Sequence, residues 1–274
     1  MIMTKQKVNV KEMGYYDAMA HLGIPFFNWG GLKATDELIE MCKVDETKSV
    51  LIVGCGSGYQ AFHIAKKYGC KVVGVDIAEN MVNWAKERAE NLNLDEKVEF
   101  QYGDAINIPF DDNIFDIVIT EFVSIFIKDK DKAFKEYARV LKPSGFVGIN
   151  EIFKSNERPP EVDEKLKEVE ETYEKVTLLD FPILTPKEWK AFFEKAGLVD
   201  ISAIECEPKQ DFKEMVSSVG GKWKFTKLSF KILYYTMTRG PLGKKLRSVG
   251  RVKSGFRKCR DYVGYLLCIG KKPI

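Results

Sequence analysis

The sequence predicts an α/β fold, in which a mostly parallel β-sheet carries helices on both faces. After Ser49, Val50–Val53 is a continuous apolar run rich in Val and Ile. This composition is typical of a strand buried on both faces of a parallel sheet. A glycine-rich turn and a run of apolar residues at helical spacing follow it, and strands and helices then keep alternating along the chain. That alternation indicates βαβ units with right-handed crossovers.

The turn after this first strand contains Gly54, Gly56 and Gly58. Strand, glycine turn and helix together place a ligand over exposed backbone N–H groups at a helix N-terminus. The spacing is G-x-G-x-G. A dinucleotide fingerprint, G-x-G-x-x-G, has its third glycine one position later, where this chain has Tyr59. No Lys followed by Ser or Thr closes the turn, which excludes a P-loop.

The second predicted strand, Lys71–Asp76, ends in a carboxylate. An acidic side chain at this position can accept hydrogen bonds from the two hydroxyls of a ribose. A helix over 79–92 and a third strand, Val98–Tyr102, follow, and Gly103-Asp104-Ala105 comes directly after that strand.

The remaining elements follow the same alternation. The pattern predicts a fourth strand over Phe115–Glu121, a helix over 130–141, a turn at Lys142-Pro-Ser-Gly145 and a fifth strand over 146–151. The charged, proline-initiated stretch 153–176 is then helical. Thr185-Pro-Lys-Glu188 matches a capping box with proline at the first helical position, so a helix should run to Ala196, before a sixth strand over 198–205.

The N-terminal part, 1–34, is interpreted as a strap or lid that precedes a helix over 35–42, with Thr35 as a plausible N-cap. It is dense in aromatic residues and glycine. One interpretation is a hydrophobic strap that closes an edge of the core. The other is a lid over ligand and acceptor, built with Tyr15, Tyr16, His21 and Trp29.

Composition excludes several classes. The 43 basic and 40 acidic residues give a net charge of only +3. Six cysteines without a C-x-x-C pair indicate neither a zinc ribbon nor a redox dithiol, and favour free thiols in a reducing cytoplasm. The longest apolar run is too short and too charged to span a bilayer. Two histidines without carboxylates at ligand spacing indicate no metal site.

The charge is unevenly distributed. Residues 209–274 contain 17 Lys and Arg against 3 Asp and Glu, a net of +14, and aromatic residues are interleaved with the basic ones. Three interpretations stay open: an amphipathic lid over an anionic or lipid-like acceptor that can rest on an acidic membrane, an RNA-binding face, or a solvated helical face that balances an acidic core.

The ordered motifs resemble the class I S-adenosylmethionine-dependent methyltransferases, in particular the methyltransferase type 11 branch with the ubiquinone/menaquinone and sterol C-methyltransferases. The resembling segments are Val53-Gly-Cys-Gly-Ser-Gly58, Gly74-Val-Asp-Ile-Ala78, Gly103-Asp-Ala105, Pro109-Phe110, Phe115-Asp116 and Arg139-Val-Leu-Lys-Pro-Ser-Gly145. The resemblance implies a Rossmann-like seven-stranded sheet of order 3-2-1-4-5-7-6, with a cofactor-binding core over 35–206. It also implies a final antiparallel strand, for which Tyr262–Gly270 is the candidate, within the last segment 262–274. The basic stretch 207–261 would then be a helical insertion.

The resemblance also implies roles for individual residues. The turn from Gly54 through Cys55, Gly56 and Ser57 to Gly58 would hold the methionine part of S-adenosylmethionine. Asp76 would bind the ribose. Ile77 and Met81 would lie at the adenine, Asp104 would meet its amino group, and Ala105 would offer a backbone amide. Glu121 and Phe122 would lie near the sulfonium and the acceptor. One departure is Ile52, where the family commonly has an acidic residue that helps to anchor the cofactor's amino end.

The implied function is methyl transfer from S-adenosylmethionine to a small or lipophilic acceptor, with S-adenosylhomocysteine as the product. Such an in-line displacement depends on positioning and needs little from a dedicated base. Glu121 and His21 are the candidate proton acceptors, and Tyr15, Tyr16 and Trp29 the candidate acceptor contacts. The expected protein is a cytoplasmic monomer or homodimer that can touch an anionic membrane through 207–261. Alternatives are a cofactor-binding relative without methyl transfer, a nicotinamide-dependent oxidoreductase, which Tyr59 disfavours, and an RNA or protein methyltransferase. Nucleic acid is disfavoured because no recognised target-binding domain is present.

Overall fold

The computed structural model describes residues 29–208, 213, 216, 221–238 and 240–274. Its centre is a seven-stranded sheet of order β3-β2-β1-β4-β5-β7-β6, as the resemblance implied. The strands are β1 Ser49–Val53, β2 Lys71–Asp76, β3 Val98–Tyr102, β4 Phe115–Glu121, β5 Leu141–Lys154, β6 Val199–Cys206 and β7 Val263–Lys271. The first five pair in parallel, whereas β7 runs antiparallel to both of its neighbours, β5 and β6.

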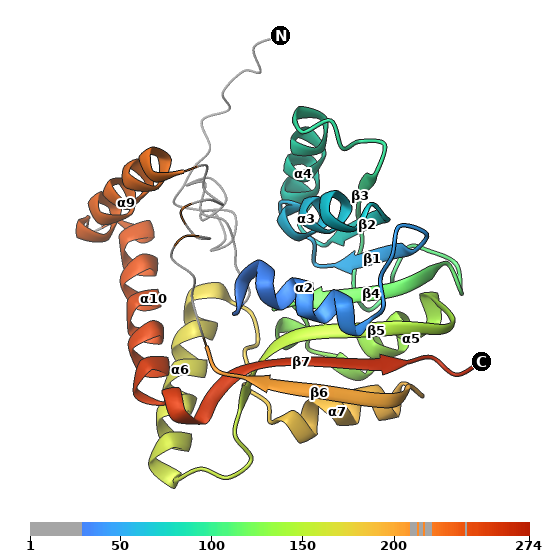
Figure 1. The fold of residues 1–274 in the computed structure, drawn as a ribbon. Helices are drawn as coiled ribbons and strands as arrows, with labels where there is room; N and C mark the ends of the chain where they lie inside the picture. Colours follow the sequence, from blue (N-terminus) through green and yellow to red (C-terminus); the bar gives the residue numbers. More distant parts are fainter. Residues whose placement is uncertain (1–28, 209–212, 214–215, 217–220, 239) are drawn as a thin grey trace.

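Helices cover both faces of the sheet (Figure 1). They are α2 Gly31–Met41, α3 Tyr59–Tyr68, α4 Glu79–Asn91, α5 Lys130–Val140, α6 Pro160–Thr177, α7 Pro186–Lys195, α9 Lys222–Met237 and α10 Pro241–Lys258, with short 3-10 turns η1 Ser124–Phe126 and η2 Arg260–Tyr262. The described part of the chain contains no helix that is both long and apolar enough to cross a bilayer.

The buried side chains form two clusters, one on each face. Leu51 and Val118 point into the cluster that α5, α6 and α7 cover. Ile52 and Ile119, their neighbours in sequence, point into the cluster covered by α2, α3 and α4. Successive strand residues alternate between faces, so a central strand that is covered on both faces must be largely apolar. This is why the first and fourth strands could be recognised in the sequence.

Two predicted details are wrong. The first helix begins at Gly31, and Thr35 lies inside it rather than at its N-cap, which is Gly30. Residues 142–145 are not a separate turn between helix and strand. They form an irregularity within β5, where Leu141 pairs with Phe115 and the ladder resumes at Phe146. The left-handed backbone of Ser144, with φ 65°, allows the extra residues to loop out of the ladder.

The long connection between β6 and β7 contains the helical hairpin α9–α10, as the predicted insertion required. Helix α10 packs along α6. Residue Gly255 lies so close to Val169 that a Cβ there would overlap that side chain. Helix α9 stands at the outer end of α10, on the side of the sheet toward which the parallel strands run (Figure 1).

Candidate functional site

The glycine turn connects the carboxyl end of β1 to α3 and is tied to the neighbouring strand. The backbone N–H groups of Gly54 and Cys55 donate to the carbonyl oxygen of Val75, at 2.8 and 3.0 Å. These bonds continue the β1–β2 pairing beyond the end of β1. The turn therefore lies directly beside Asp76, the last residue of β2.

The three glycines of the turn have left-handed backbones, with φ of 74° at Gly54, 50° at Gly56 and 81° at Gly58. A Cβ at Gly54 would overlap the Val123 side chain, and one at Gly58 would lie 2.8 Å from the Phe62 ring. These two glycines are required by packing. Gly56 differs, because a Cβ there would meet nothing within 4 Å. Its backbone borders open space, as expected where a ligand approaches the chain.

Asp76 joins the turn to the start of α4. Its Oδ2 accepts a hydrogen bond from the Gly56 N–H and its Oδ1 accepts one from the Ala78 N–H, each at 2.8 Å. Burial raises the pKa of this carboxyl, and the two amide bonds act in the opposite direction. The carboxylate is thus held in place beside the glycine that borders open space. Its remaining lone pairs can accept hydrogen bonds from the hydroxyl groups of a ligand.

Exposed apolar side chains lie next to Asp76, at Ile77 and at the end of β3. Ile77 is 63% exposed and Tyr102, at the end of β3, is 59% exposed, whereas Met81 is buried in α4. After β3, Asp104 Oδ1 accepts from the Ile106 N–H at 3.1 Å and Ala105 is buried. An exposed Ile beside this fixed carboxylate offers an apolar surface on which a flat ring can lie.

Two polar residues fix the Glu121 carboxylate at the end of β4. It accepts a hydrogen bond from the Thr35 hydroxyl at 3.0 Å and one from the Asn150 side-chain amide at 3.1 Å. Glu121 follows Ile119 by two residues, so it projects from the same face of the sheet as Ile52, in the adjacent strand. Glu121 therefore places a carboxylate on the same face of the sheet as the apolar Ile52, one strand away.

Phe122 begins an aromatic wall. Its backbone is left-handed, with φ 56°, and its N–H donates to the Asn150 carbonyl at 2.7 Å. Its ring lies 5.6 Å from Phe126 and 6.3 Å from Phe181, and Tyr173 stacks on Phe181 at 4.1 Å. This wall follows the carboxyl end of β4, next to the glycine turn.

Trp29 is near this edge as well. Its ring meets Phe256 of α10 edge to face at 5.1 Å, and its carbonyl accepts from the Asn150 amide at 3.3 Å. Of the other predicted residues, Cys55 is buried, and Ser57 accepts hydrogen bonds from Arg88 at both its carbonyl and its hydroxyl, each at 2.9 Å. Tyr15, Tyr16 and His21 lie outside the described residues.

Glu151 was missed by sequence reasoning. It is fully buried within β5, three residues before the strand ends at Lys154. Its Oε1 accepts from the N–H groups of Val123 at 3.0 Å and Ser124 at 2.6 Å. Within the described chain its Oε2 has no hydrogen-bond partner. Burial raises its pKa to about 8, although the nearby Lys130 acts to lower it. The signal was a carboxylate at the end of the apolar run predicted as the fifth strand, 146–151, as at Asp76 and Glu121.

Much of the chain is similar in sequence to known proteins. The sequence profile of the methyltransferase domain family matches residues 44–197. An uncharacterized protein of Haemophilus influenzae is 33% identical over 198 residues, 72% of this chain and 76% of that protein. The phosphoethanolamine N-methyltransferase 1 of Arabidopsis thaliana is 34% identical over 152 residues, 56% of this chain. The chain spans only 30% of the length of that plant protein.

Solved structures show the same fold. The phosphoethanolamine N-methyltransferase 2 of Haemonchus contortus, in complex with phosphomonomethylethanolamine and S-adenosylhomocysteine, has a TM-score of 0.70 at 23% identity. The match covers 94% of this chain and 57% of that one. The [4+2]-cyclase SpnF has a TM-score of 0.72 at 20% identity, covering 94% of each chain.

Proposed function

Because the chain belongs to the methyltransferase domain family, whose cofactor is S-adenosylmethionine, we propose that the site at the carboxyl edge of β1, β2 and β4 transfers a methyl group to a small or lipophilic acceptor. The single observation that carries this proposal is the pairing of Gly56 with Asp76. A glycine bordering open space is hydrogen-bonded to a fixed carboxylate one strand away.

The residues present fit this cofactor. Gly56 leaves room along the turn for the methionine part, Asp76 can accept from the ribose hydroxyls, and the exposed Ile77 can lie against the adenine. The buried Met81 lies in the first turn of α4, and Asp104 and Ala105 follow the end of β3. When bound, the cofactor supplies a methyl group made electrophilic by its sulfonium.

Glu121 completes the cofactor site in this proposal. The family's usual carboxylate is replaced by Ile52, which is buried and apolar. Glu121 lies on the same face, and Thr35 and Asn150 hold its carboxylate in one orientation. A fixed carboxylate at this edge can hold the cofactor's ammonium group, because charge-assisted hydrogen bonds are about twice as strong as neutral ones.

The acceptor would lie against the aromatic wall of Phe122, Phe126 and Phe181, with Trp29 at its border. Such a wall excludes water and can hold either an apolar group or a cationic amine over a ring face. Small molecules bound in solved structures of similar fold include phosphomonomethylethanolamine and, in a geranyl diphosphate C-methyltransferase, geranyl diphosphate. Glu121 and His21 remain the proposed proton acceptors, and Tyr15 and Tyr16 the proposed acceptor contacts.

The binding half of the proposal is tested by calorimetric titration of the full chain with S-adenosylhomocysteine. Asp76→Ala and Asp76→Asn remove the carboxylate and should weaken binding about 10- to 100-fold, the worth of one or two hydrogen bonds to a charged group. The exposed Asp95→Asn is the charge-matched control and should bind as wild type does. Equal affinity in all four proteins would refute the assignment.

The transfer half needs a second assay, because a likeness in fold does not fix the reaction, as the cyclase neighbour illustrates. Incubation with methyl-labelled S-adenosylmethionine and a metabolite extract should label a small molecule, and Asp76→Ala should remove that label. Cofactor binding without any labelled product would identify a relative that binds the cofactor without methyl transfer. Label in RNA or protein would identify the other alternative.

Localisation and assembly belong to the same proposal. All six cysteines are free thiols, which favours a reducing compartment such as the cytoplasm. A monomer or homodimer is proposed, with a membrane contact that is peripheral at most. Light scattering coupled to gel filtration distinguishes the two assemblies.

A further inference from the structure

Helix α9 carries apolar side chains on the side that faces away from the protein. Its described residues include no buried side chain, although the helix contains nine large apolar or aromatic ones. Five of these are exposed by more than half. They are Trp223 at 71%, Phe230 at 67%, Leu233 at 54%, Tyr234 at 66% and Met237 at 77%.

These five residues form one stripe. At 3.6 residues per turn they fall within an arc of about 100° around the helix. The half-buried residues of α9 lie on the opposite side: Phe225, Leu228, Ile232 and Tyr235. The stripe is therefore a second apolar face, additional to the one that packs against the protein.

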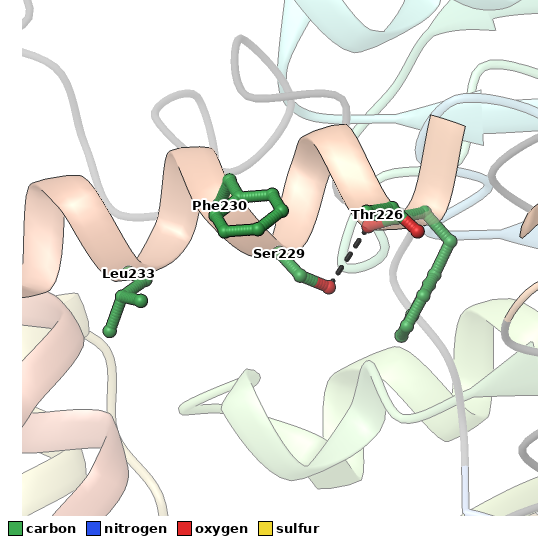
Figure 2. A pocket seen from close by; sticks show the side chains of 5 residues that line it. Thr226, Ser229, Phe230 and Leu233 are labelled. Atoms are coloured by element: carbon green, nitrogen blue, oxygen red, sulfur yellow. Dashed lines mark hydrogen bonds between the residues drawn. The ribbon is translucent and has the colours of Figure 1, made fainter. Parts of the chain in front are cut away.

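Figure 2 shows the middle of this helix, where Phe230 and Leu233 lie beside Thr226 and Ser229 along a shallow hollow. The two hydroxyls do not make the hollow polar. Thr226 donates to the Lys222 carbonyl and Ser229 to the Phe225 carbonyl, each at 2.9 Å. Their donors are satisfied within the helix, so the surface they leave is apolar.

Lysines flank the stripe rather than interrupt it. On the same helical projection, Lys224, Lys227 and Lys231 follow one border and Lys222 the other. None of these four forms an ion pair with any residue that the structure describes. Lys227 instead lies over the Trp223 ring, 5.1 Å from its centroid.

The charge of the α9–α10 segment itself has a single sign. Residues 215–260 contain 13 Lys and Arg and no Asp or Glu. Within α10, seven positions are basic: Lys244, Lys245, Arg247, Arg251, Lys253, Arg257 and Lys258. A surface of this charge, next to an apolar stripe with a Trp, matches a plane of anionic lipid headgroups above acyl chains.

The hairpin also holds α9 in an outward position. Arg247 Nη1 donates to the carbonyls of Thr236 and Thr238, at 2.6 and 2.7 Å, at the end of α9. At Gly243 a Cβ would overlap the Tyr235 and Thr238 carbonyl oxygens, so only glycine permits this close corner. The corner sets α9 at the outer end of α10 (Figure 1), and the side chains of the stripe are exposed there.

We propose that α9, supported by the basic face of α10, is a docking surface for anionic phospholipid membranes, with the stripe Trp223, Phe230, Leu233, Tyr234 and Met237 inserted at the headgroup boundary. Nucleic acid fits less well. Aliphatic side chains such as Leu233 and Met237 offer no flat face on which a base could stack, and a single convex helix provides no groove for a phosphate backbone. The docking surface does not depend on methyl transfer or on cofactor binding.

The test uses sedimentation of the full-length protein with unilamellar vesicles. At low salt, the protein should pellet with vesicles of phosphatidylcholine and phosphatidylserine mixed two to one, and should stay in the supernatant with phosphatidylcholine alone. Raising the salt should weaken pelleting, because screening acts on exposed charges. Failure to pellet with the anionic vesicles, or equal pelleting with both kinds, would overturn the proposal.

Two sets of variants separate charge from insertion. Lys224→Gln/Lys227→Gln/Lys231→Gln should lower the vesicle partition coefficient about 100-fold, near fivefold for each lysine. The control, Lys66→Gln/Lys86→Gln/Lys187→Gln, removes the same charge from exposed positions on α3, α4 and α7 and should leave partitioning unchanged. Trp223→Ser/Phe230→Ser keeps the net charge and should still reduce partitioning at least tenfold. A loss shared by the control lysines would refute a surface at α9.

Trp223 supplies a direct readout of insertion. Its emission should shift to shorter wavelength when anionic vesicles are added, because its exposed indole leaves water. Trp223→Phe should abolish the shift while pelleting persists. Tight binding of single-stranded RNA at the same salt, with no vesicle-induced shift, would assign the surface to nucleic acid instead.

Discussion

Gly56 and Gly197 share a backbone conformation but not a position in the fold. Both have positive φ, 50° and 76°, and a Cβ at either would meet nothing within 4 Å. Gly56 lies in the turn beside Asp76, whereas Gly197 follows α7. A side chain at either position brings a similar backbone strain. A difference in ligand binding between the two variants would therefore come from the added side chain in the turn.

We expect Gly56→Val to lose detectable S-adenosylhomocysteine binding in calorimetry. The expected cost in unfolding free energy is about 1–2 kcal/mol, because an L side chain adopts this left-handed conformation poorly. Gly197→Val should show the same loss in urea unfolding and bind the ligand normally. If the two variants bound equally well, the turn would not be the cofactor site.

Glu151 links pH to stability. Its pKa is raised by burial to about 8 in the folded protein, against about 4.3 for an ordinary Glu in the unfolded chain. Below the unfolded value both states are protonated. Between the two values only the unfolded state ionises, so the stability associated with the neutral Glu151 falls as pH rises, by about 1.4 kcal/mol per pH unit, until the folded group ionises too.

This dependence is measured by urea unfolding of wild type and Glu151→Gln between pH 5 and pH 8. Gln keeps an oxygen for the Val123 and Ser124 N–H groups but cannot ionise. We expect wild type to lose stability relative to the variant across this range. The exposed Glu164→Gln should run parallel to wild type. Parallel curves for Glu151→Gln would mean that Glu151 is ionised in the folded protein.

The sequence predicted the site residues that lie at strand ends. It missed the residues that reach the site only through tertiary contacts. Asp76 and Glu121 each end an apolar run, so their place at the carboxyl edge followed from the strand pattern. Thr35 bonds to Glu121 across 86 residues of sequence, and Asn150 does so from another strand. Neither contact leaves a local pattern in the chain.

Among the elements, α7 shows how a local motif determines a helix start. The Thr185 hydroxyl accepts from the Glu188 N–H at 3.3 Å, and the Glu188 carboxylate accepts from the Thr185 N–H at 2.7 Å. This capping box, with Pro186 at the first helical position, was predicted from four residues and is confirmed. All its partners are within three positions, so no tertiary contact was needed to identify it.

Thr185→Ala should therefore destabilise the protein by about 1 kcal/mol in urea unfolding, the usual worth of an N-cap. Glu188→Gln should cost less, because Gln can also complete a capping box. S-adenosylhomocysteine binding should be unaffected in both, since α7 packs against α5, β6 and β7 rather than against the glycine turn. A stability unchanged by Thr185→Ala would contradict the role of the cap.

Helix α2 shows the opposite case. Thr35 is a good N-cap residue, and it was predicted to begin this helix. In the structure the helix begins four residues earlier, and the Thr35 hydroxyl binds the buried Glu121 instead. Leaving a buried carboxylate without a hydrogen-bond donor costs far more free energy than leaving a helix end without a side-chain cap. The tertiary partner decided the position.

The whole molecule depends on its last strand. Pairing on both sides, β7 joins β5 to β6, and eight of its nine residues are buried. Ending the chain after residue 262 should leave β6 without a neighbour and yield insoluble protein that binds no S-adenosylhomocysteine. Removing only Pro273 and the exposed Ile274 should change neither solubility nor binding. Soluble expression and calorimetry of both truncations provide the check.

The strand order is a feature of the whole chain and came from the resemblance rather than from periodicity. Apolar runs predicted where the strands are, but they do not encode which strands are neighbours. The antiparallel pairing of β7 across the long insertion, confirmed here, was implied by the ordered motifs alone. The position of α9 at the outer end of the hairpin had no signal in sequence, since it depends on the corner at Gly243.

The separation of β6 from β7 has a consequence for biosynthesis. In the described sheet β6 is an edge strand whose neighbour is β7, and residues 207–262 lie between them. At a translation rate of about 5–20 residues per second, β6 waits for several seconds on the ribosome before its partner is made. An unpaired strand edge invites association with other chains, so the nascent protein should be a good client for chaperones during that interval.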